Sequence, residues 1–354
     1  MSWNNVSGIK NIKIWTDFSD STQGHLFVND QHQLSLNVGL SFNLKSGTTE
    51  GPTEDEVKSA LSLINNQDSG PLKYLVLADS AGRFNAIYDP YYPQAVPTAD
   101  TDPVDDGIYD FQFTYIVSSP TSLNAKVYSE SVALKLEYTI TNSDGTTKQV
   151  IQETSAAGSA TKTAVVIVCY PSVLYGKSGE NRKNLTFTSY TVADEDCWDV
   201  EGHFNHSGDR FKVFPLGIDD PYFKIFYFDG GAEPDSSIVH NPYFIRKEYS
   251  KVEWDHIYNS FFPNIKCGEF DFDVKISVRS DLDDSHDVIV TENITVHQQE
   301  NQITFLTGFS SAQSLNHEHN VSDRIYLRVY DQFGNNAYVV VYAGEETVTL
   351  TSVS

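Results

Sequence analysis

The sequence predicts an all-β protein of tandem β-sandwich domains, with one accessory helix near residues 53–64. Three long segments carry an apolar residue at every second position, which is typical of a strand that packs one face on a core. Shorter strand-like segments fill the intervals, and turn-forming residues separate them at the spacing of a sandwich. Only one segment has the spacing of a helix.

The three alternating segments cover residues 34–44, 132–140 and 270–278. In the third segment the polar positions include Asp271 and Asp273, which we expect to face solvent. Each segment predicts a long antiparallel strand with one buried face. Shorter strands are expected at residues 11–15, 72–77, 84–88, 109–117, 164–169, 185–190, 211–214, 222–228, 288–290, 303–306, 325–330, 338–342 and 347–350.

The helix is predicted from its N-terminal signal. Thr53-x-x-Glu56 is a capping box, in which two side chains satisfy free backbone N–H groups at the start of a helix. Glu54 and Asp55 lie in the expected first turn, where the helix dipole favours negative charge. Apolar residues then follow at helical spacing, at Val57, Ala60, Leu61 and Ile64.

The chain of 354 residues divides into three blocks if each long alternating strand lies early in its own domain. These predicted domains cover residues 1–118, 119–235 and 236–354, and the third opens with an aromatic-rich segment. An Asp- and Pro-rich run at residues 97–106 marks the first junction, and a Gly- and Pro-containing run at residues 230–234 marks the second. Such runs are typical of linkers between domains.

A weak internal repeat supports a tandem arrangement. Residues 74–82 and 326–334 share a Tyr-Leu pair, an aliphatic strand and an Asp-x-x-Gly turn. The strand that ends in Asp331-x-x-Gly334-Asn335 resembles the closing hairpin of bacterial immunoglobulin-like domains, and residues 26–33 resemble the start of such a domain. This resemblance implies two or three tandem immunoglobulin-like sandwiches, and its motifs contain no catalytic residue.

The charge balance excludes several functions. The chain has 24 basic and 48 acidic side chains and a net charge of −24, which would repel a nucleic-acid backbone. No run approaches the ~18 apolar residues that a membrane-spanning helix needs. The N-terminus lacks the features of a secretory signal, so we expect synthesis in the cytoplasm, with an extracellular location after release as the alternative.

The sequence offers one candidate metal site and no disulfide framework. Asp102, Asp105 and Asp106 lie at the first junction, where their carboxylates could bind calcium. The alternative is a solvated acidic loop, because the sequence has no EF-hand pattern. No other cofactor is expected. The cysteines form no C-x-x-C pair, and we expect reduced thiols at Cys169, Cys197 and Cys267.

Enzymatic motifs are missing from the sequence. It has no Gly-x-Ser-x-Gly, no cysteine with a nearby histidine partner and no glycine-rich phosphate loop in a suitable strand–turn–helix setting. Carboxylates are so plentiful that no pair stands out as a general acid and base. We therefore expect a protein that is not an enzyme.

The most suggestive local feature is a stretch that is both aromatic and basic. Aromatic residues and arginine dominate the energetics of protein interfaces. We interpret the stretch as a contact surface for another copy, a glycan or a receptor, and the alternative is packing between the second and third blocks. Its candidate contact residues are Tyr243, Phe244, Arg246, Lys247, Tyr249, Trp254 and Tyr258.

The sequence as a whole favours a structural role. The absence of a chemical motif, the modular sandwiches and the single basic-aromatic stretch on an acidic chain predict a subunit that self-assembles into a filament, tube or surface layer. The expected partner is another copy of the chain. The alternative is a carbohydrate- or receptor-binding protein, such as an adhesin or a toxin component.

Overall fold

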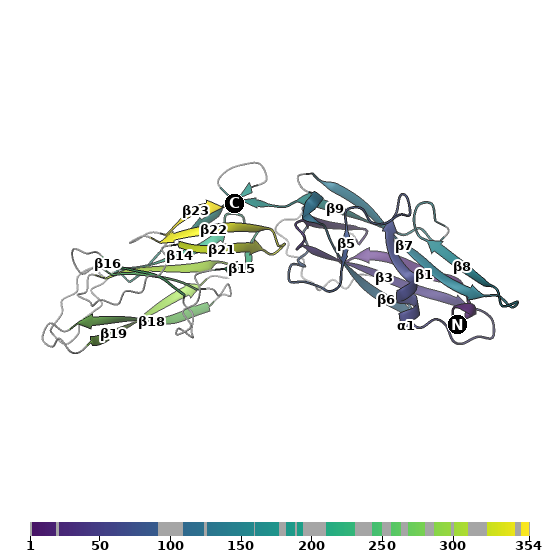
Figure 1. Ribbon diagram of the computed structural model, residues 1–354, viewed down its shortest axis with the longest axis horizontal. Coiled ribbons are helices and arrows are strands. Elements are labelled where there is room, and N and C mark those ends of the chain that lie inside the picture. The colour runs from purple at the N-terminus through teal and green to yellow at the C-terminus, as the bar shows by residue number, and fades with distance from the viewer. Residues whose placement is uncertain are drawn as a thin grey trace. The chain divides into compact units, whose positions relative to one another are not determined.

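The structure is a computed structural model, shown as a ribbon in Figure 1. It describes residues 2–18, 21–90, 109–123, 126–158, 160–176, 182–187, 190–193, 210–230, 243–249, 256–262, 268–279, 287–298, 301–310, 324–343 and 348–353. Contacts between residues divide the chain into two units. Unit 1 contains residues 1–172 and 333–335, and unit 2 contains residues 173–332 and 336–354.

The prediction of an all-β protein is confirmed. The described part of the chain is mostly β-strand, arranged in several sheets, with a single α-helix. The three alternating segments form long strands with bounds close to those expected. These strands are β3 (Gln33–Leu44), β7 (Tyr128–Thr141) and β18 (Gly268–Arg279).

The first sheet of unit 1 is antiparallel, with the strand order β1-β3-β6-β5. Its central strand β3 is flanked by β1 (Val6–Thr16) and β6 (Phe111–Ser118). The short β5 (Val76–Ala78) pairs with the end of β6. A 3-10 turn at Ser2–Asn5 leads directly into β1, and a second one lies at Thr121–Leu123.

The second sheet of unit 1 has the order β2-β9-β7-β4. It joins β2 (Gln23–Val28), β9 (Val165–Pro171) and β4 (Leu61–Asn65) to β7, and only the β2–β9 pairing is parallel. The other half of β7 forms a hairpin with β8 (Thr147–Glu153), whose turn contains Gly145 at φ +83°. Asp144 accepts a hydrogen bond from the backbone N–H of Thr146 and so closes this turn.

The two sheets of unit 1 share one hydrophobic core. Leu36, Val38 and Leu40 of β3 and Leu134 and Leu136 of β7 are fully buried in it. Burying each such side chain contributes about 1.5–3 kcal/mol. A shift of register by one residue would move a whole set of apolar side chains to the solvent face, so the alternation fixes the pairing. Cys169 on β9 is also buried as a free thiol, and burial raises its pKa to about 11.

The predicted helix exists but is shorter than expected. Helix α1 runs from Glu54 to Ala60, and both hydrogen bonds of the Thr53–Glu56 capping box are present. The prediction that it continues to Ile64 was wrong, because residues 61–65 form β4. Leu61 lies opposite Leu136 of β7, so pairing with a buried strand overrides the local helical spacing.

The first sheet of unit 2 contains six strands, and its longest path has the order β12-β14-β20-β17-β16. These strands are β12 (Leu185–Phe187), β14 (Arg210–Ile218), β20 (Ile303–Ser310), β17 (His256–Phe262) and β16 (Tyr243–Tyr249). The sixth strand, β13 (Tyr190–Ala193), also pairs with β14. The pairings within this sheet are antiparallel.

The second sheet of unit 2 has the order β15-β21-β22-β23 and is antiparallel. Its strands are β15 (Ile225–Gly230), β21 (Arg324–Asp331), β22 (Asn336–Ala343) and β23 (Val348–Val353). Strand β18 forms a separate antiparallel pair with β19 (Asp287–Gln298). The short strands β10 (Leu174–Tyr175) and β11 (Arg182–Lys183) pair in parallel.

The two copies of the predicted internal repeat differ in structure. Residues 326–334 form β21 and the turn to β22. A strand was expected at residues 84–88, but the structure, which describes these residues, has no strand there. The carbonyl of Phe84 accepts from the N–H of Gln33, and the carbonyl of Ala86 accepts from the ring of His32. These two carbonyls therefore have hydrogen-bond partners although residues 84–88 do not pair as a strand in a sheet. The carboxylate of Asp331 accepts from the hydroxyl of Tyr175 at 2.6 Å.

The division into three predicted domains stays a prediction. Its first boundary, between residues 118 and 119, lies inside unit 1, where β7 pairs with β4. Its second boundary, between residues 235 and 236, lies in a segment outside the described residues.

Candidate functional site

The predicted basic-aromatic stretch falls on the antiparallel pair β16–β17. Lys247 pairs with Tyr258 and Tyr249 pairs with His256, and the register shifts between Phe244 and Arg246. Strand β16 lies at the end of its sheet, and within the described residues it pairs only with β17. The stretch therefore supplies a sheet edge, a feature that its composition alone did not predict. Trp254 lies outside the described residues.

The register also divides the predicted contact residues between the two faces of the β16–β17 pair. Successive residues of a strand belong to opposite faces, and the irregularity after Phe244 shifts this alternation by one residue. The positions of one face are Phe244, Lys247, Tyr249 and Tyr258, and those of the other are Tyr243 and Arg246. A role in contact stays a prediction for all of them.

The predicted calcium ligands Asp102, Asp105 and Asp106 lie outside the described residues, and so do Cys197 and Cys267. Within the ranges that the structure describes, no group of three or more His, Cys, Asp or Glu side chains is arranged to hold a metal ion. Calcium binding therefore stays a prediction.

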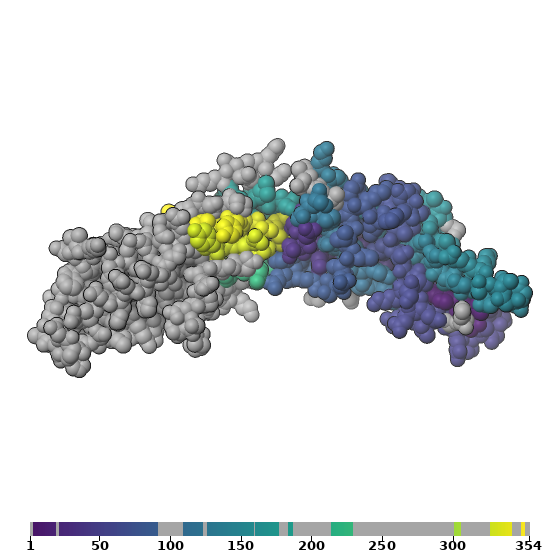
Figure 2. Space-filling view, viewed as in Figure 1, coloured from purple at the N-terminus to yellow at the C-terminus, as the bar shows by residue number. Residues whose placement is uncertain are grey.

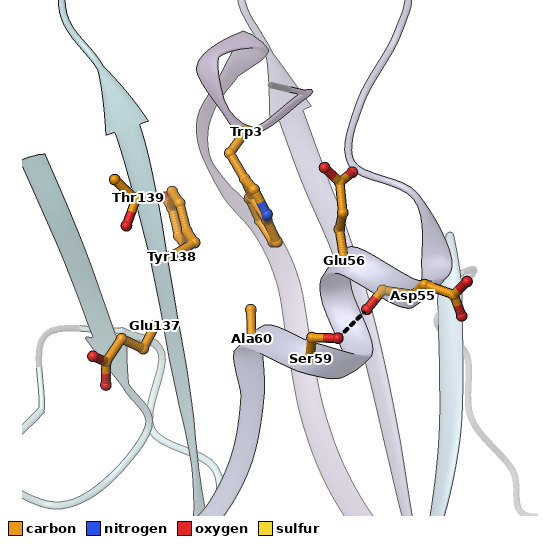
Figure 3. A pocket seen from close by; sticks show the side chains of 8 residues that line it. All are labelled: Trp3, Asp55, Glu56, Ser59, Ala60, Glu137, Tyr138 and Thr139. Atoms are coloured by element: carbon orange, nitrogen blue, oxygen red, sulfur yellow. Dashed lines mark hydrogen bonds between the residues drawn. The ribbon is translucent and has the colours of Figure 1, made fainter. Parts of the chain in front are cut away.

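A pocket of about 420 Å³ lies at one end of unit 1, between the N-terminal turn, helix α1 and strand β7. Figure 2 shows the N-terminal residues, the segment around α1 and the β7–β8 hairpin gathered at this end of the unit. Eight residues line the pocket and are drawn in Figure 3. They are Trp3, Asp55, Glu56, Ser59, Ala60, Glu137, Tyr138 and Thr139.

An aromatic pair forms one wall of this pocket. The rings of Trp3 and Tyr138 stack with centroids 4.3 Å apart and planes 16° apart, and Phe42 meets the Trp3 ring edge-on. Trp3 is 7% exposed and Tyr138 is 8% exposed. The turn that carries Trp3 is held in place by Asn4, which accepts from the N–H of Thr141, and by Asn5, which donates to the carbonyl of Glu50.

The polar atoms of the two rings have no partner within the described part of the chain. Neither the indole N–H of Trp3 nor the hydroxyl of Tyr138 makes a hydrogen bond there, and neither atom is sealed from solvent. In Figure 3 the nitrogen of Trp3 lies on the side of the ring that faces α1. Burial of the Tyr138 ring raises the pKa of its hydroxyl, so Tyr138 is protonated at neutral pH.

Three carboxylates also line the pocket, two of them (Asp55 and Glu56) from helix α1 and the third (Glu137) from strand β7 beside Tyr138. Glu56 accepts from Thr53 in the capping box. Glu137 pairs with Lys135 at 2.6 Å and accepts from the side-chain amide of Gln149. Asp55 makes no hydrogen bond or ion pair through its carboxylate within the described ranges, although its backbone carbonyl accepts from Ser59. The pocket thus combines unpaired donors on aromatic rings with carboxylate acceptors.

Sequence reasoning missed this pocket. The alternating segment identified Tyr138 as a core residue, and the capping box identified Asp55 and Glu56 as part of a helix. Nothing local placed Trp3 beside them, because the contact joins segments that are about 50 and 135 residues apart in the chain. Long-range contacts of this kind have no periodicity to reveal them.

A second polar cluster in unit 1 is buried and serves packing. His32 is fully enclosed, accepts from the N–H of Phe27 through Nδ1 and donates through Nε2 to the carbonyl of Ala86. These two bonds require the neutral ring, and burial lowers its pKa to about 4. The aromatic rings of Phe27 and Phe333 pack around it. His32 therefore fixes a loop and offers no acid–base chemistry near neutral pH.

Comparison with protein families and with characterised proteins found no match to this chain. Among the helices that the structure describes, none is long and apolar enough to cross a membrane.

Proposed function

We propose that this chain is a non-enzymatic structural protein whose two immunoglobulin-like units assemble with other copies, through their sheet edges, into a filament, tube or surface layer. The proposal has two parts. The first concerns the type of domain, and the second concerns the contact that joins one copy to the next.

The order of strands in unit 1 supports an immunoglobulin-like domain. In that fold, seven strands named A to G in chain order form one sheet with the order A-B-E-D and another that contains C, F and G. Unit 1 has β1-β3-β6-β5 in one sheet and β4-β7-β9 in the other, which is the same order when β1 is strand A and β9 is strand G. Strand β2 then continues strand A into the second sheet.

Unit 2 supports the same assignment with larger insertions. Its strands β12-β14-β20-β17 correspond to A-B-E-D, and β15-β21-β22 correspond to C-F-G. Strand β16 then lies between C and D, and the β18–β19 pair lies between D and E. Because each unit has this order by itself, we propose two such domains and not three.

The observation that carries the assembly proposal is a pair of open sheet edges of equal length. Strand β8 of unit 1 and β16 of unit 2 each have seven residues, and within the described residues each pairs with one neighbour only. Ile151 of β8 is 47% exposed. An open edge is a template for another strand, and natural proteins usually block it when it has no partner.

We propose that β8 of one copy pairs with β16 of the next copy. The two edges belong to different units, so the contact is heterologous and repeats along a chain of copies without limit unless the rotation closes a ring.

Electron microscopy and light scattering of the purified chain test this proposal. We expect polymers or rings for the natural chain and monomers for Ile151→Lys, which adds a charge to the open edge. Ser35→Lys, on the central strand β3 that is paired on both sides, is the matched control and should still assemble. Monomers at all concentrations of the natural chain would contradict the proposal.

A glycan-binding function is the second candidate, and one observation favours it. Tyr326 and Tyr338 are exposed on neighbouring strands of unit 2, with ring centroids 6.3 Å apart. An exposed tyrosine offers an apolar ring face and a hydroxyl that can hydrogen-bond, and a sugar has both apolar C–H groups and hydroxyls. A glycan array tests this function. Binding by the natural chain that is lost in Tyr338→Ala would support it, and no binding of the natural chain to any glycan would contradict it.

A further inference from the structure

We infer that unit 1 contains a socket for the turn Phe333–Asn335, and that this socket also binds the same turn of a second copy of the chain. In the structure the turn is seated, and it counts as part of unit 1, whose other residues are 1–172. The contact does not involve the sheet edges of the proposed function and does not depend on their pairing. The socket consists of Phe27, Asn29, Gln31, His32, Phe84 and Tyr88.

Asn29 is the polar centre of the socket. Its side-chain Nδ2 donates to the carbonyl of Phe333 at 2.9 Å and to Oδ1 of Asn335 at 3.0 Å. Its Oδ1 accepts from the backbone N–H groups of Gln31 at 3.0 Å and His32 at 2.7 Å. The loop of the socket therefore orients the amide, and both of its N–H donors are directed at the turn.

Phe333 is the apolar anchor of the turn. It is 1% exposed, and the centroid of its ring lies 5.5 Å from that of Phe27 and 5.3 Å from those of His32 and Tyr88. Aromatic rings at such distances attract each other beyond the gain from buried area. A buried aromatic side chain that fills a pocket is also the usual energetic centre of a protein interface. The turn thus has the properties of a ligand for unit 1.

Gly334 makes the fit specific. Its φ of +75° lies in the left-handed region that favours glycine. A Cβ at this position would lie 2.5 Å from the Cβ of Gln31 and 3.1 Å from the ring of Phe84. A residue other than glycine would therefore push the turn out of the socket, so the socket selects the sequence Phe-Gly-Asn.

Exchange between copies follows from how local these contacts are. The hydrogen bonds and ring contacts described above involve only consecutive residues of one turn, so the turn of another copy can make the same ones. The exchange keeps the contact and loses only the tethering within one chain, as in domain swapping. Because the socket and the turn are different surfaces, each copy can give its turn to one neighbour and receive that of another.

Two variants allow the contact between copies to be measured by itself. Asn29→Asp keeps an oxygen for the N–H groups of Gln31 and His32 but places a second oxygen against the two acceptors of the turn, so it breaks the socket. Phe333→Ala removes the anchor and so breaks the turn. In a mixture of the two chains, an intact socket and an intact turn can meet only between copies.

Analytical ultracentrifugation of this mixture tests the inference. Both chains also carry Ile151→Lys, so that the edge of β8 does not contribute and failure of the proposed assembly leaves the result unaffected. We expect each variant alone to be a monomer and the mixture to form a 1:1 complex. The Asn29→Asp chain mixed with a chain that carries both Asn29→Asp and Phe333→Ala is the matched control, and it should stay monomeric because it contains no intact socket. Monomers in the first mixture, with both variants folded by thermal unfolding, would overturn the inference.

A peptide measurement needs no variant of the turn. A fluorescent cyclised peptide with the sequence of residues 331–336 is titrated with the Ile151→Lys chain, with and without Asn29→Asp, and its anisotropy is recorded. We expect saturable binding to the chain with Asn29, in competition with its own turn, and at least about tenfold weaker binding with Asn29→Asp. Equal binding to both chains, or binding to neither, would overturn the inference.

Discussion

Two glutamates on the same strand of unit 1 have opposite environments. Glu130, near the start of β7, is buried and accepts from the side chain of Asn65 at 3.0 Å and from the backbone N–H groups of Lys73 and Tyr74 at 2.7 Å. Glu137, seven residues later, is partly exposed, lines the pocket and pairs with Lys135. The acceptors of Glu130 are filled by buried groups of the protein, whereas the carboxylate of Glu137 stays in contact with solvent.

This difference separates polar groups that hold the fold together from polar groups that contribute little to its stability. A buried carboxylate is tolerated only when hydrogen bonds replace its lost water, so Glu130 fixes the segment around Lys73 and Tyr74 to β7. A carboxylate at the rim of a pocket keeps part of its water and contributes little to stability. Removing each group should therefore have very different consequences.

The largest effect is expected for Glu130. Glu130→Gln places an amide against two backbone N–H donors and removes the charge that strengthens those bonds. We expect unit 1 to lose about 3 kcal/mol of stability, measured by urea unfolding. Glu153→Gln on the exposed edge strand β8 is the control, and it should change stability by less than about 0.5 kcal/mol. Equal effects of the two variants would contradict this account of Glu130.

A second test uses pH and another buried polar group of unit 1, His32. Its pKa is about 4 in the folded chain and 6.5 ordinarily, so between these values the unfolded chain binds a proton that the folded chain does not. The contribution of His32 is therefore complete above pH 6.5 and is lost as the pH falls toward 4, a change of about 3 kcal/mol. His32→Asn should remove this part of the pH dependence of unfolding, and an unchanged profile would show that the ring is not buried as a neutral group.

A smaller effect is expected where a polar group is exposed but satisfies a backbone donor. Thr53 caps helix α1 by accepting from the N–H of Glu56. Thr53→Ala should cost about 1 kcal/mol in chemical unfolding, and Thr53→Ser should cost much less because the hydroxyl remains. The same loss in both variants would mean that the methyl group, and not the cap, supports the helix.

The smallest effect is expected for Glu137 itself. Glu137→Gln removes its ion pair with Lys135, and the side chains of both partners are partly exposed. The Glu137 carboxylate raises the pKa of Lys135, but solvent screens such a pair. We expect a loss of less than about 0.5 kcal/mol in unfolding. A loss as large as that of Glu130→Gln would erase the distinction between the two glutamates.

Local pattern predicted the strands better than it predicted their partners. The alternating segments became β3, β7 and β18, because a half-buried strand needs apolar residues at every second position. The capping box predicted the start of α1 correctly for a similar reason, since the free N–H groups of a first turn need nearby acceptors. Both signals depend on residues within a few positions of each other.

The features that sequence reasoning missed depend on distant contacts. Residues 61–65 became a strand because β7 lies beside them, and residues 84–88 did not, because other groups satisfy their carbonyls. The wall of the pocket required Trp3 to meet Tyr138. The sheet edge at β16 became visible only with the strand order of unit 2. Periodicity carries none of this information.

Cross-linking between copies tests the central claim, that β8 of one copy pairs with β16 of another. Chains of natural isotopic composition and chains enriched in nitrogen-15 are mixed and treated with a lysine-reactive cross-linker, and the products are identified by mass spectrometry. We expect links between Lys148 of one copy and Lys247 of the other, and their loss in Ile151→Lys. Assemblies without mixed-isotope links between these two lysines would contradict the claim.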